Sequence, residues 1–209
     1  YSHFAEHLGR CIYGGIWVGK DSKIENDQGI RCDTMKALKK LALPAIRWPG
    51  GCFADTYHWR EGIGPAGQRP KRHNLWWNQP ETNQFGTEEF MQLCRMTDSE
   101  PYICLNVGSG TVEEARSWVE YCNSNQPTSL VKERGKNGHR ESYNVKFWGI
   151  GNENGGCGGH MRPEYYADLY RRFATYVRKT TGEEAKLIAC SPLIFIFHIH
   201  HKTFDSTVW

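Results

Sequence analysis

An amide and a carboxyl group stand side by side at the end of an apolar run, at Asn152 and Glu153. The preceding residues, 145–150, are rich in β-branched and aromatic types, which favours a strand, and the glycines within 155–159 favour turns. Barrel enzymes place their chemistry at the carboxyl ends of such strands. The pattern therefore indicates a catalytic acid, and the alternative is that the pair only begins a loop.

A second apolar run ends in the same manner. Residues 41–46 lead into Arg47-Trp-Pro-Gly-Gly-Cys-Phe53, which contains a cation, a rigid proline and two glycines. The long segment 51–80 that follows is rich in Gly, Pro and Trp, and we predict an extended loop that builds a binding wall. Its tryptophans either stack on sugar rings or pack in the core. They are Trp59, Trp76 and Trp77.

The order of the elements predicts an α/β fold with a parallel sheet, because strand-like and helix-like segments alternate. The apolar stripe of the last helix repeats at helical spacing, and Pro163 suits its first turn. Five βα units are fewer than the eight that close a barrel. The predicted strands span 10–17, 45–48, 101–107, 145–150 and 186–190, and the predicted helices span 30–41, 87–96, 112–122 and 163–180.

Six motifs in order along the chain resemble the α-L-arabinofuranosidases of glycoside hydrolase family 51. They lie at 13–16, 45–65, 81–90, 106–111, 148–153 and 161–165. The resemblance implies a complete (β/α)₈ TIM barrel followed by a C-terminal β-sandwich. We therefore expect residues 1–209 to form an incomplete barrel domain without the sandwich. Residues 192–209 are expected to be an anomalous tail, because about 10 residues replace a loop, a helix and a strand.

The family resemblance also implies the roles of individual residues. Glu153 is the expected general acid/base, and Asn152 is expected to bond the sugar 2-hydroxyl. Glu6, Arg47 and Cys52 match substrate-binding positions of the family. The alternatives are a solvated charge for Glu6, a structural pairing with a core carboxylate for Arg47, and simple packing for Cys52. In place of a large apolar residue found in many relatives, Gly155 follows the Asn-Glu-Asn sequence.

The implied activity is hydrolysis of terminal non-reducing α-L-arabinofuranosyl groups from arabinan, arabinoxylan and oligosaccharides. A reaction that retains the configuration at the anomeric carbon requires a second carboxylate as the nucleophile. The resemblance places that residue beyond Trp209, so the chain by itself is expected to be inactive. The alternatives are a degenerate carbohydrate-binding fragment and an endo-glucanase or xylosidase of the same family.

Composition adds few constraints. The formal net charge is +3 and basic residues are interspersed with acidic ones, so no nucleic-acid surface is indicated. No apolar run approaches the ~20 residues that span a bilayer. The eight cysteines are dispersed and are expected to be reduced core residues, which favours a cytoplasmic location. No cofactor is expected, and a homo-oligomer is expected only by analogy with the family.

A metal site is not expected either. His198, His200 and His201 lie near the chain end, and Cys157 and His160 are closely spaced. A structural zinc site usually needs four well-spaced ligands and a coherent set of supporting contacts. The histidine run is therefore interpreted as part of the anomalous tail.

Overall fold

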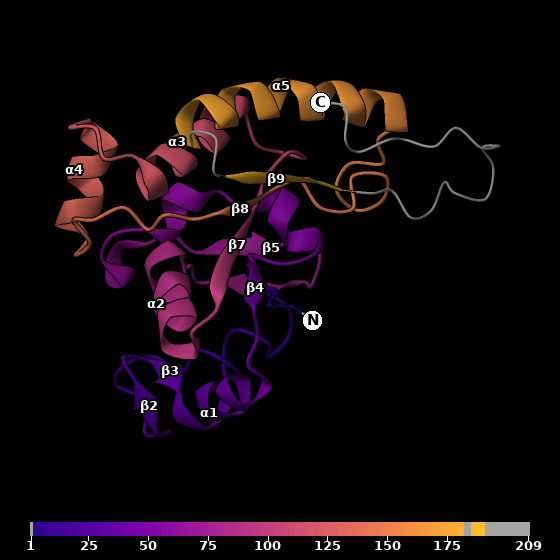
Figure 1. The fold of residues 1–209 in the computed structure, drawn as a ribbon. Coiled ribbons are helices and arrows are strands. Elements are labelled where there is room, and N and C mark those ends of the chain that lie inside the picture. Colours follow the sequence, from indigo (N-terminus) through magenta and orange to yellow (C-terminus); the bar gives the residue numbers. More distant parts are fainter. Residues whose placement is uncertain (1, 182–184, 191–209) are drawn as a thin grey trace.

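Five parallel strands form the central sheet (Figure 1). The computed structural model describes residues 2–181 and 185–190 of the chain. The spatial order is β1-β4-β7-β8-β9, and every neighbouring pair is parallel. The strands are β1 (His3–Phe4), β4 (Ala45–Trp48), β7 (Glu100–Leu105), β8 (Phe147–Ile150) and β9 (Lys186–Ala189).

Helices connect these parallel strands, as the alternating pattern predicts. In Figure 1, α5 lies beside α3 on the outside of the sheet. The α/β class is therefore confirmed, while closure into a barrel stays a prediction. The helices are α1 (Cys32–Leu41), α2 (Thr87–Thr97), α3 (Val112–Asn123), α4 (Ser129–Lys136) and α5 (Pro163–Thr181).

The last described helix, α5, begins at Pro163, as expected for a residue whose missing N–H is not needed in the first turn. Its apolar stripe faces the protein interior, where Phe173 and Val177 are buried. No helix in the described part of the chain combines the length and the apolar character needed to cross a bilayer.

Aromatic side chains fill the core between the sheet and the helices. Trp48 on β4 stacks on Phe90 of α2, with ring centroids 5.1 Å apart. Trp118 of α3 packs parallel to Trp59, with ring centroids 6.1 Å apart. Trp59 is therefore a core residue and does not line a sugar subsite. Because side chains alternate along a strand, Arg47 leaves β4 on the face opposite to Trp48.

The first predicted strand is wrong. Residues 10–17 form turns with isolated bridges, and the first strand of the sheet is instead the two-residue β1. Gly14 has φ 84°, and a Cβ on Gly15 would lie 2.1 Å from the carbonyl oxygen of Arg10. This segment therefore needs glycine in a tight turn, which a regular strand does not.

The predicted long loop 51–80 has local structure of its own. It contains three short 3₁₀ helices, η1 (Cys52–Thr56), η2 (Trp59–Gly62) and η3 (Ala66–Gln68). Its end forms an antiparallel hairpin of β5 (Arg72–Asn74) and β6 (Gln79–Glu81). A further small ribbon, β2 (Asn26–Asp27) with β3 (Ile30–Arg31), precedes α1. The anomalous tail 192–209, with its three histidines, lies outside the described residues.

Candidate active site

The carboxyl ends of β4 and β8 bring the two strand-end motifs together. Arg47 Nη1 donates to Oδ1 of Asn152 at 2.8 Å and also contacts Cys104 Sγ on the intervening strand β7 at 3.7 Å. The guanidinium lies over the Phe4 ring, 4.8 Å from its centroid. Among the described residues, Arg47 has no ion pair with a carboxylate. Its observed partner is Asn152, and the alternative of a structural pairing with a core carboxylate is not found among these residues.

Asn152 is held by groups from two directions. It is 4% exposed, and its backbone N–H donates to Asp55 Oδ2 at 2.8 Å. The Asn152 side-chain oxygen Oδ1 accepts from Arg47, so the side-chain nitrogen Nδ2 carries both amide hydrogens. This nitrogen is buried and has no acceptor within the described residues. A buried amide with an unused donor is suited to binding a hydroxyl group.

Glu153 is exposed at the mouth of this site. Its backbone has φ 45°, a left-handed conformation that is costly for a residue with a side chain. The carbonyl oxygen of Glu153 accepts the N–H groups of Gly156 at 2.7 Å and Gly158 at 3.0 Å. These two bonds fix the backbone of the turn, and such strain is typical of functional positions.

Glu6 is buried at 5% exposure, beside the Pro-Gly-Gly turn that follows β4. Its Oε1 accepts the N–H of Phe53 at 3.1 Å. A Cβ on Gly50 would lie 2.4 Å from the Glu6 Cγ, and one on Gly51 would lie 3.1 Å from both carboxylate oxygens. The two glycines therefore leave room for this carboxylate. The interpretation of Glu6 as a solvated surface charge is wrong.

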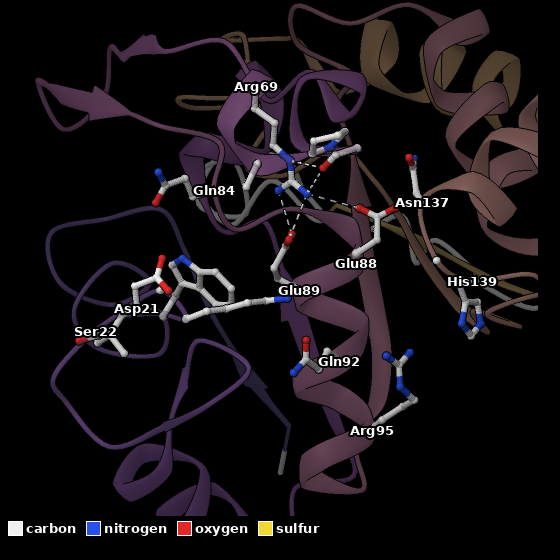
Figure 2. Close-up of a pocket in the computed structure, with 18 of the residues that line it drawn as sticks. Asp21, Ser22, Arg69, Gln84, Glu88, Glu89, Gln92, Arg95, Asn137 and His139 are labelled. Atoms are coloured by element: carbon white, nitrogen blue, oxygen red, sulfur yellow. Dashed lines mark hydrogen bonds and ion pairs between the residues drawn. The ribbon is translucent and has the colours of Figure 1, made fainter.

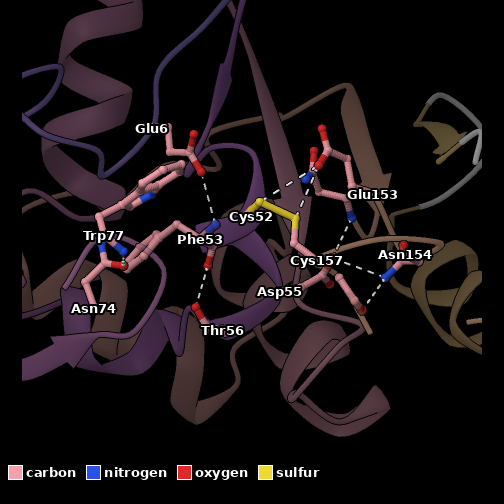
Figure 3. The surroundings of a disulfide bond; sticks show 12 residues. Glu6, Cys52, Phe53, Asp55, Thr56, Asn74, Trp77, Glu153, Asn154 and Cys157 are labelled. Atoms are coloured by element: carbon pink, nitrogen blue, oxygen red, sulfur yellow. Dashed lines mark hydrogen bonds between the residues drawn. A yellow bond between two sulfur atoms is a disulfide. The ribbon is translucent and has the colours of Figure 1, made fainter. Parts of the chain in front are cut away.

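Cys52 and Cys157 form a disulfide, which corrects the prediction that all eight cysteines are reduced core residues (Figure 3). Glu153 Oε2 lies 3.8 Å from Cys52 Sγ and 3.2 Å from Cys157 Sγ. These are contacts and not hydrogen bonds, because disulfide sulfur carries no hydrogen. Cys94, Cys104 and Cys122 are free and buried, as predicted, while Cys11 is exposed. His160 is not part of the cluster that Cys52, Glu153 and Cys157 form.

Asp55 follows the second motif, where the sequence indicates a cap of a turn or strand end and not a catalytic residue, and it organises the site from beneath. This carboxylate is 2% exposed. Oδ1 accepts the N–H groups of Val107 at 2.7 Å and Gly108 at 2.9 Å, and Oδ2 accepts from Asn152 N and Asn154 Nδ2. Burial raises the pKa of Asp55 to about 6, and these four donors oppose that rise. Asp55 therefore joins the ends of β7 and β8.

A second buried network fixes the segment that carries Glu6. Trp48 Nε1 donates to His7 Nε2 at 3.0 Å, so the other ring nitrogen, Nδ1, carries the hydrogen and donates to Glu81 Oε2 at 2.7 Å. Glu81 Oε1 accepts from Tyr13 and from the N–H of Asn83. Burial raises the pKa of Glu81, but the hydrogen bonds from His7 and Tyr13 outweigh it and leave the pKa below its ordinary value.

Two further tryptophans were expected either to line the subsites or to pack in the core. Trp77 is 38% exposed, and Figure 3 draws it on the Glu6 side of the disulfide. Trp76 is half-buried, and its Nε1 has no partner in the described part of the chain. Trp77 therefore has a free face on which a sugar ring could stack.

A cavity of about 780 Å³ lies elsewhere, along α2 (Figure 2). Its lining includes the buried ion pair of Arg69 with Glu89, which is bidentate at 2.9 and 3.0 Å. None of the sequence-predicted site residues lines it. We place the candidate active site at the strand ends, because the polar side chains of both motifs converge there.

Comparisons with known proteins agree with this architecture. A family model described as the alpha-L-arabinofuranosidase 1 domain matches residues 37–205. An intracellular exo-alpha-L-arabinofuranosidase from Bacteroides ovatus is 55% identical over 190 residues, which make up 90% of this chain and 37% of that relative. Alpha-L-arabinofuranosidase C of Emericella nidulans is 52% identical over 153 residues, or 73% of this chain and 30% of that protein.

Solved structures give the same result. The family 51 arabinofuranosidase from Xanthomonas axonopodis pv. citri matches with a TM-score of 0.87 and 47% identity, covering 90% of this chain and 38% of that one. The arabinose complex of the Thermotoga maritima α-L-arabinofuranosidase matches with a TM-score of 0.86 and 48% identity. The match covers 90% of this chain and 39% of that one.

The fold and these matches define an α-L-arabinofuranosidase domain of the α/β class. The chain belongs to glycoside hydrolase family 51. It spans well under half the length of these relatives.

Proposed function

We propose that this chain carries the acid/base half of a retaining exo-α-L-arabinofuranosidase with a (β/α)₈ barrel, in which Glu153 protonates the departing glycosidic oxygen. The observation that carries this proposal is that Glu153 stands next to Asn152, whose side-chain oxygen accepts from Arg47 and whose backbone N–H donates to Asp55, both from the other motif. An acid next to an unused amide donor fits a reaction in which a sugar hydroxyl is bonded while its neighbouring glycosidic bond breaks.

The second carboxylate of a retaining mechanism lies ~5–5.5 Å from the first. Asp55 is engaged by four N–H donors and Glu6 supports the turn at Phe53, so neither is suited to attack the anomeric carbon. We propose that the nucleophile comes from another part of the enzyme. In this arrangement Glu6 and the unused Nδ2 donor of Asn152 bind furanose hydroxyls, and Cys52 lines the site beside Glu153.

We further propose terminal arabinofuranosyl groups of arabinan, arabinoxylan and oligosaccharides as substrates, and a cytoplasmic location. The names of the relatives support the sugar, and the intracellular Bacteroides ovatus enzyme supports the location. Exposed Trp77 beside the Glu6 side of the site supplies an apolar face for a sugar ring.

A chimera tests the role of Glu153. Residues 1–190 replace the matching part of the Thermotoga maritima enzyme, whose remaining barrel supplies the other strands. Glu153→Gln should lower kcat/KM by about 10²–10⁴-fold on an arabinobioside, whose leaving group needs a proton. The loss of kcat/KM should be far smaller on the 2,4-dinitrophenyl arabinofuranoside, because kcat/KM reports the bond-breaking step and this leaving group departs without a proton.

The exposed Glu164→Gln is the matched control and should leave both rates unchanged. Equal losses on the two substrates would contradict the acid role. Faster release of nitrophenol from a xyloside, or of sugar from a glucan, would identify the endo-glucanase or xylosidase alternative. An active parent chimera whose Glu153→Gln variant keeps full activity on both substrates would leave this chain as a binding element only.

A further inference from the structure

The two sulfur atoms of the disulfide lie next to a carboxylate oxygen of Glu153, the proposed acid (Figure 3). Cys52 of η1 and Cys157 of the loop after β8 have their Cα atoms 5.5 Å apart. The potential ligand atoms of Cys52, Glu153 and Cys157 all lie within 4.8 Å of one another. Glu153 is exposed and both cysteines are only half-buried, so an ion from solvent can reach the cluster.

We propose that reduction of the Cys52–Cys157 disulfide creates a binding site for one thiophilic divalent metal ion, such as Zn²⁺ or Cd²⁺. A dithiol reductant supplies two electrons, so the sulfur–sulfur bond becomes two thiols and the reductant becomes its own cyclic disulfide. The metal ion then replaces both thiol protons, which go to solvent, and the ionised Glu153 supplies the third ligand.

The existing geometry already fits two of the three ligand–ligand distances. In tetrahedral coordination, Zn–S and Zn–O bonds of about 2.3 and 2.0 Å set sulfur and oxygen ligands about 3.5 Å apart. Glu153 Oε2 lies 3.8 Å from Cys52 Sγ and 3.2 Å from Cys157 Sγ, which brackets that value. Only the two sulfur atoms must separate, to about 3.8 Å, once their bond is broken. The fourth position is left for water.

The surroundings hold the three ligands in place. The Glu153 turn is closed by two N–H groups, from Gly156 and Gly158. Arg47 is directed to Asn152, where it bonds at 2.8 Å. Three of the other thiols are poorly placed to compete, because Cys94, Cys104 and Cys122 are buried and burial raises the pKa of each thiol.

Metal binding would occupy the Glu153 oxygen that has to carry a proton, so the ion would inhibit hydrolysis. This consequence rests on the proposed function, whereas metal binding itself does not. The two are therefore measured separately, with binding on the 209-residue chain and inhibition on the chimera.

Binding is tested by titrating the reduced chain with Co²⁺, a spectroscopic substitute for Zn²⁺, and then displacing it with Zn²⁺. We expect a thiolate-to-cobalt charge-transfer band that saturates at one ion per chain and is absent from the oxidised chain. Cys52→Ser and Cys157→Ser should each abolish the band. Glu153→Gln should weaken binding at least about tenfold. Cys11→Ser, at an exposed cysteine outside the cluster, is the control and should leave the band unchanged.

A second measurement on the unmutated chain does not depend on how the variants fold. Zn²⁺ should protect Cys52 and Cys157, but not Cys11, from alkylation by iodoacetamide, as read by peptide mass spectrometry. A cobalt band that survives both serine variants, or equal alkylation of Cys52 and Cys157 with and without Zn²⁺, would overturn the metal site. In the chimera, Zn²⁺ should inhibit only after reduction, and a chelator should restore the rate. Uninhibited turnover with the site occupied would refute the role of Glu153 and leave the metal site standing.

Discussion

At the scale of single residues, the candidate site depends on buried polar groups whose donors and acceptors are matched. Asp55 shows this most clearly, since each of its two carboxylate oxygens accepts two N–H groups from the ends of neighbouring strands. A carboxylate offers only acceptors, whereas an amide of the same shape would place hydrogens against existing donors. Asp55 is therefore a positioning residue for Asn152 and Glu153.

Asp55→Asn tests this positioning role. The variant should destabilise the chain by about 1–3 kcal/mol. The amide nitrogen takes the place of one carboxylate oxygen and cannot accept, so the buried N–H groups that bonded to that oxygen lose their acceptor. In the chimera, kcat should fall while KM changes little, since the acid is displaced from the glycosidic oxygen. Urea unfolding and steady-state kinetics measure the two effects. Asp168→Asn, an exposed change on α5, is the control. Unchanged kcat with reduced stability would make Asp55 purely structural.

Glu88 on α2 provides a pH-dependent test. Burial raises its pKa from the ordinary value of 4.5 to about 7, although Tyr121 donates to its Oε1. The folded chain therefore holds this proton more tightly than the unfolded chain, so its contribution to stability is present below pH ~4.5 and is lost as pH rises to ~7. Glu88→Gln should remove this loss and raise stability relative to the parent at pH 8 by about 1–3 kcal/mol.

Urea midpoints at pH 5 and pH 8 check the Glu88 prediction. The control is Glu141→Gln, at an exposed side chain between α4 and β8. The unfolding curves of this control should follow those of the parent chain at both pH values. If the Glu88→Gln and parent curves shift in parallel with pH, burial does not hold the proton on this carboxyl group.

The residue scale also shows what sequence could reveal about the site. Glu153, Asn152 and Arg47 stand at strand ends in recognisable motifs, and the structure brings them together. The disulfide partner of Cys52 is 105 residues away, so no local spacing indicated it. Asp55 lies in a short 3₁₀ helix, and its partners come from two other strand ends, so its role could be found only in three dimensions.

At the scale of elements, the strong signals predicted the fold and the weak ones failed. Strand β4 was predicted with its observed bounds, and the four predicted helices agree within two residues, because their apolar side chains repeat at helical spacing and pack on the core. Strand β1 has only two residues, both exposed, and cannot show periodicity. Helix α4 escaped prediction because its eight residues include only two large apolar side chains, Leu130 and Val131.

Tyr166 ties one of these helices to the sheet. Its hydroxyl donates to the Ile150 carbonyl oxygen at 2.7 Å and accepts the Cys190 N–H at 2.6 Å, so α5 is joined to the ends of β8 and β9. Tyr166→Phe should cost about 1–3 kcal/mol of unfolding free energy, since both backbone groups lose this partner. Tyr165→Phe, at a neighbouring side chain that is 53% exposed, should change stability by less than about 0.5 kcal/mol.

Hydrogen exchange localises the effect of Tyr166. Faster exchange should concentrate at the backbone of β8 and β9 in Tyr166→Phe and should be absent in the Tyr165→Phe control. Equal destabilisation by the two variants would show that the hydroxyl bridge is not what anchors α5.

At the scale of the whole molecule, the described sheet has two outer edges, on β1 and β9. Within residues 2–181 and 185–190, neither edge carries a further strand. Parallel sheets are normally covered on both faces and closed or protected at their edges, because unpaired backbone groups are templates for another chain. Phe4 on β1 is 53% exposed and adds apolar surface at that edge.

We therefore expect the 209-residue chain, expressed alone, to self-associate as its concentration rises. Light scattering coupled to size exclusion should give a mass above 24.1 kDa that increases with loading. In the chimera, the remaining strands of the Thermotoga maritima enzyme would pair with both edges. The measured mass should then equal that of the assembly which the Thermotoga maritima enzyme itself forms, and it should not change with loading. A concentration-independent mass of 24.1 kDa for the chain alone would mean that its edges are protected, and the sheet would then be stable without further strands.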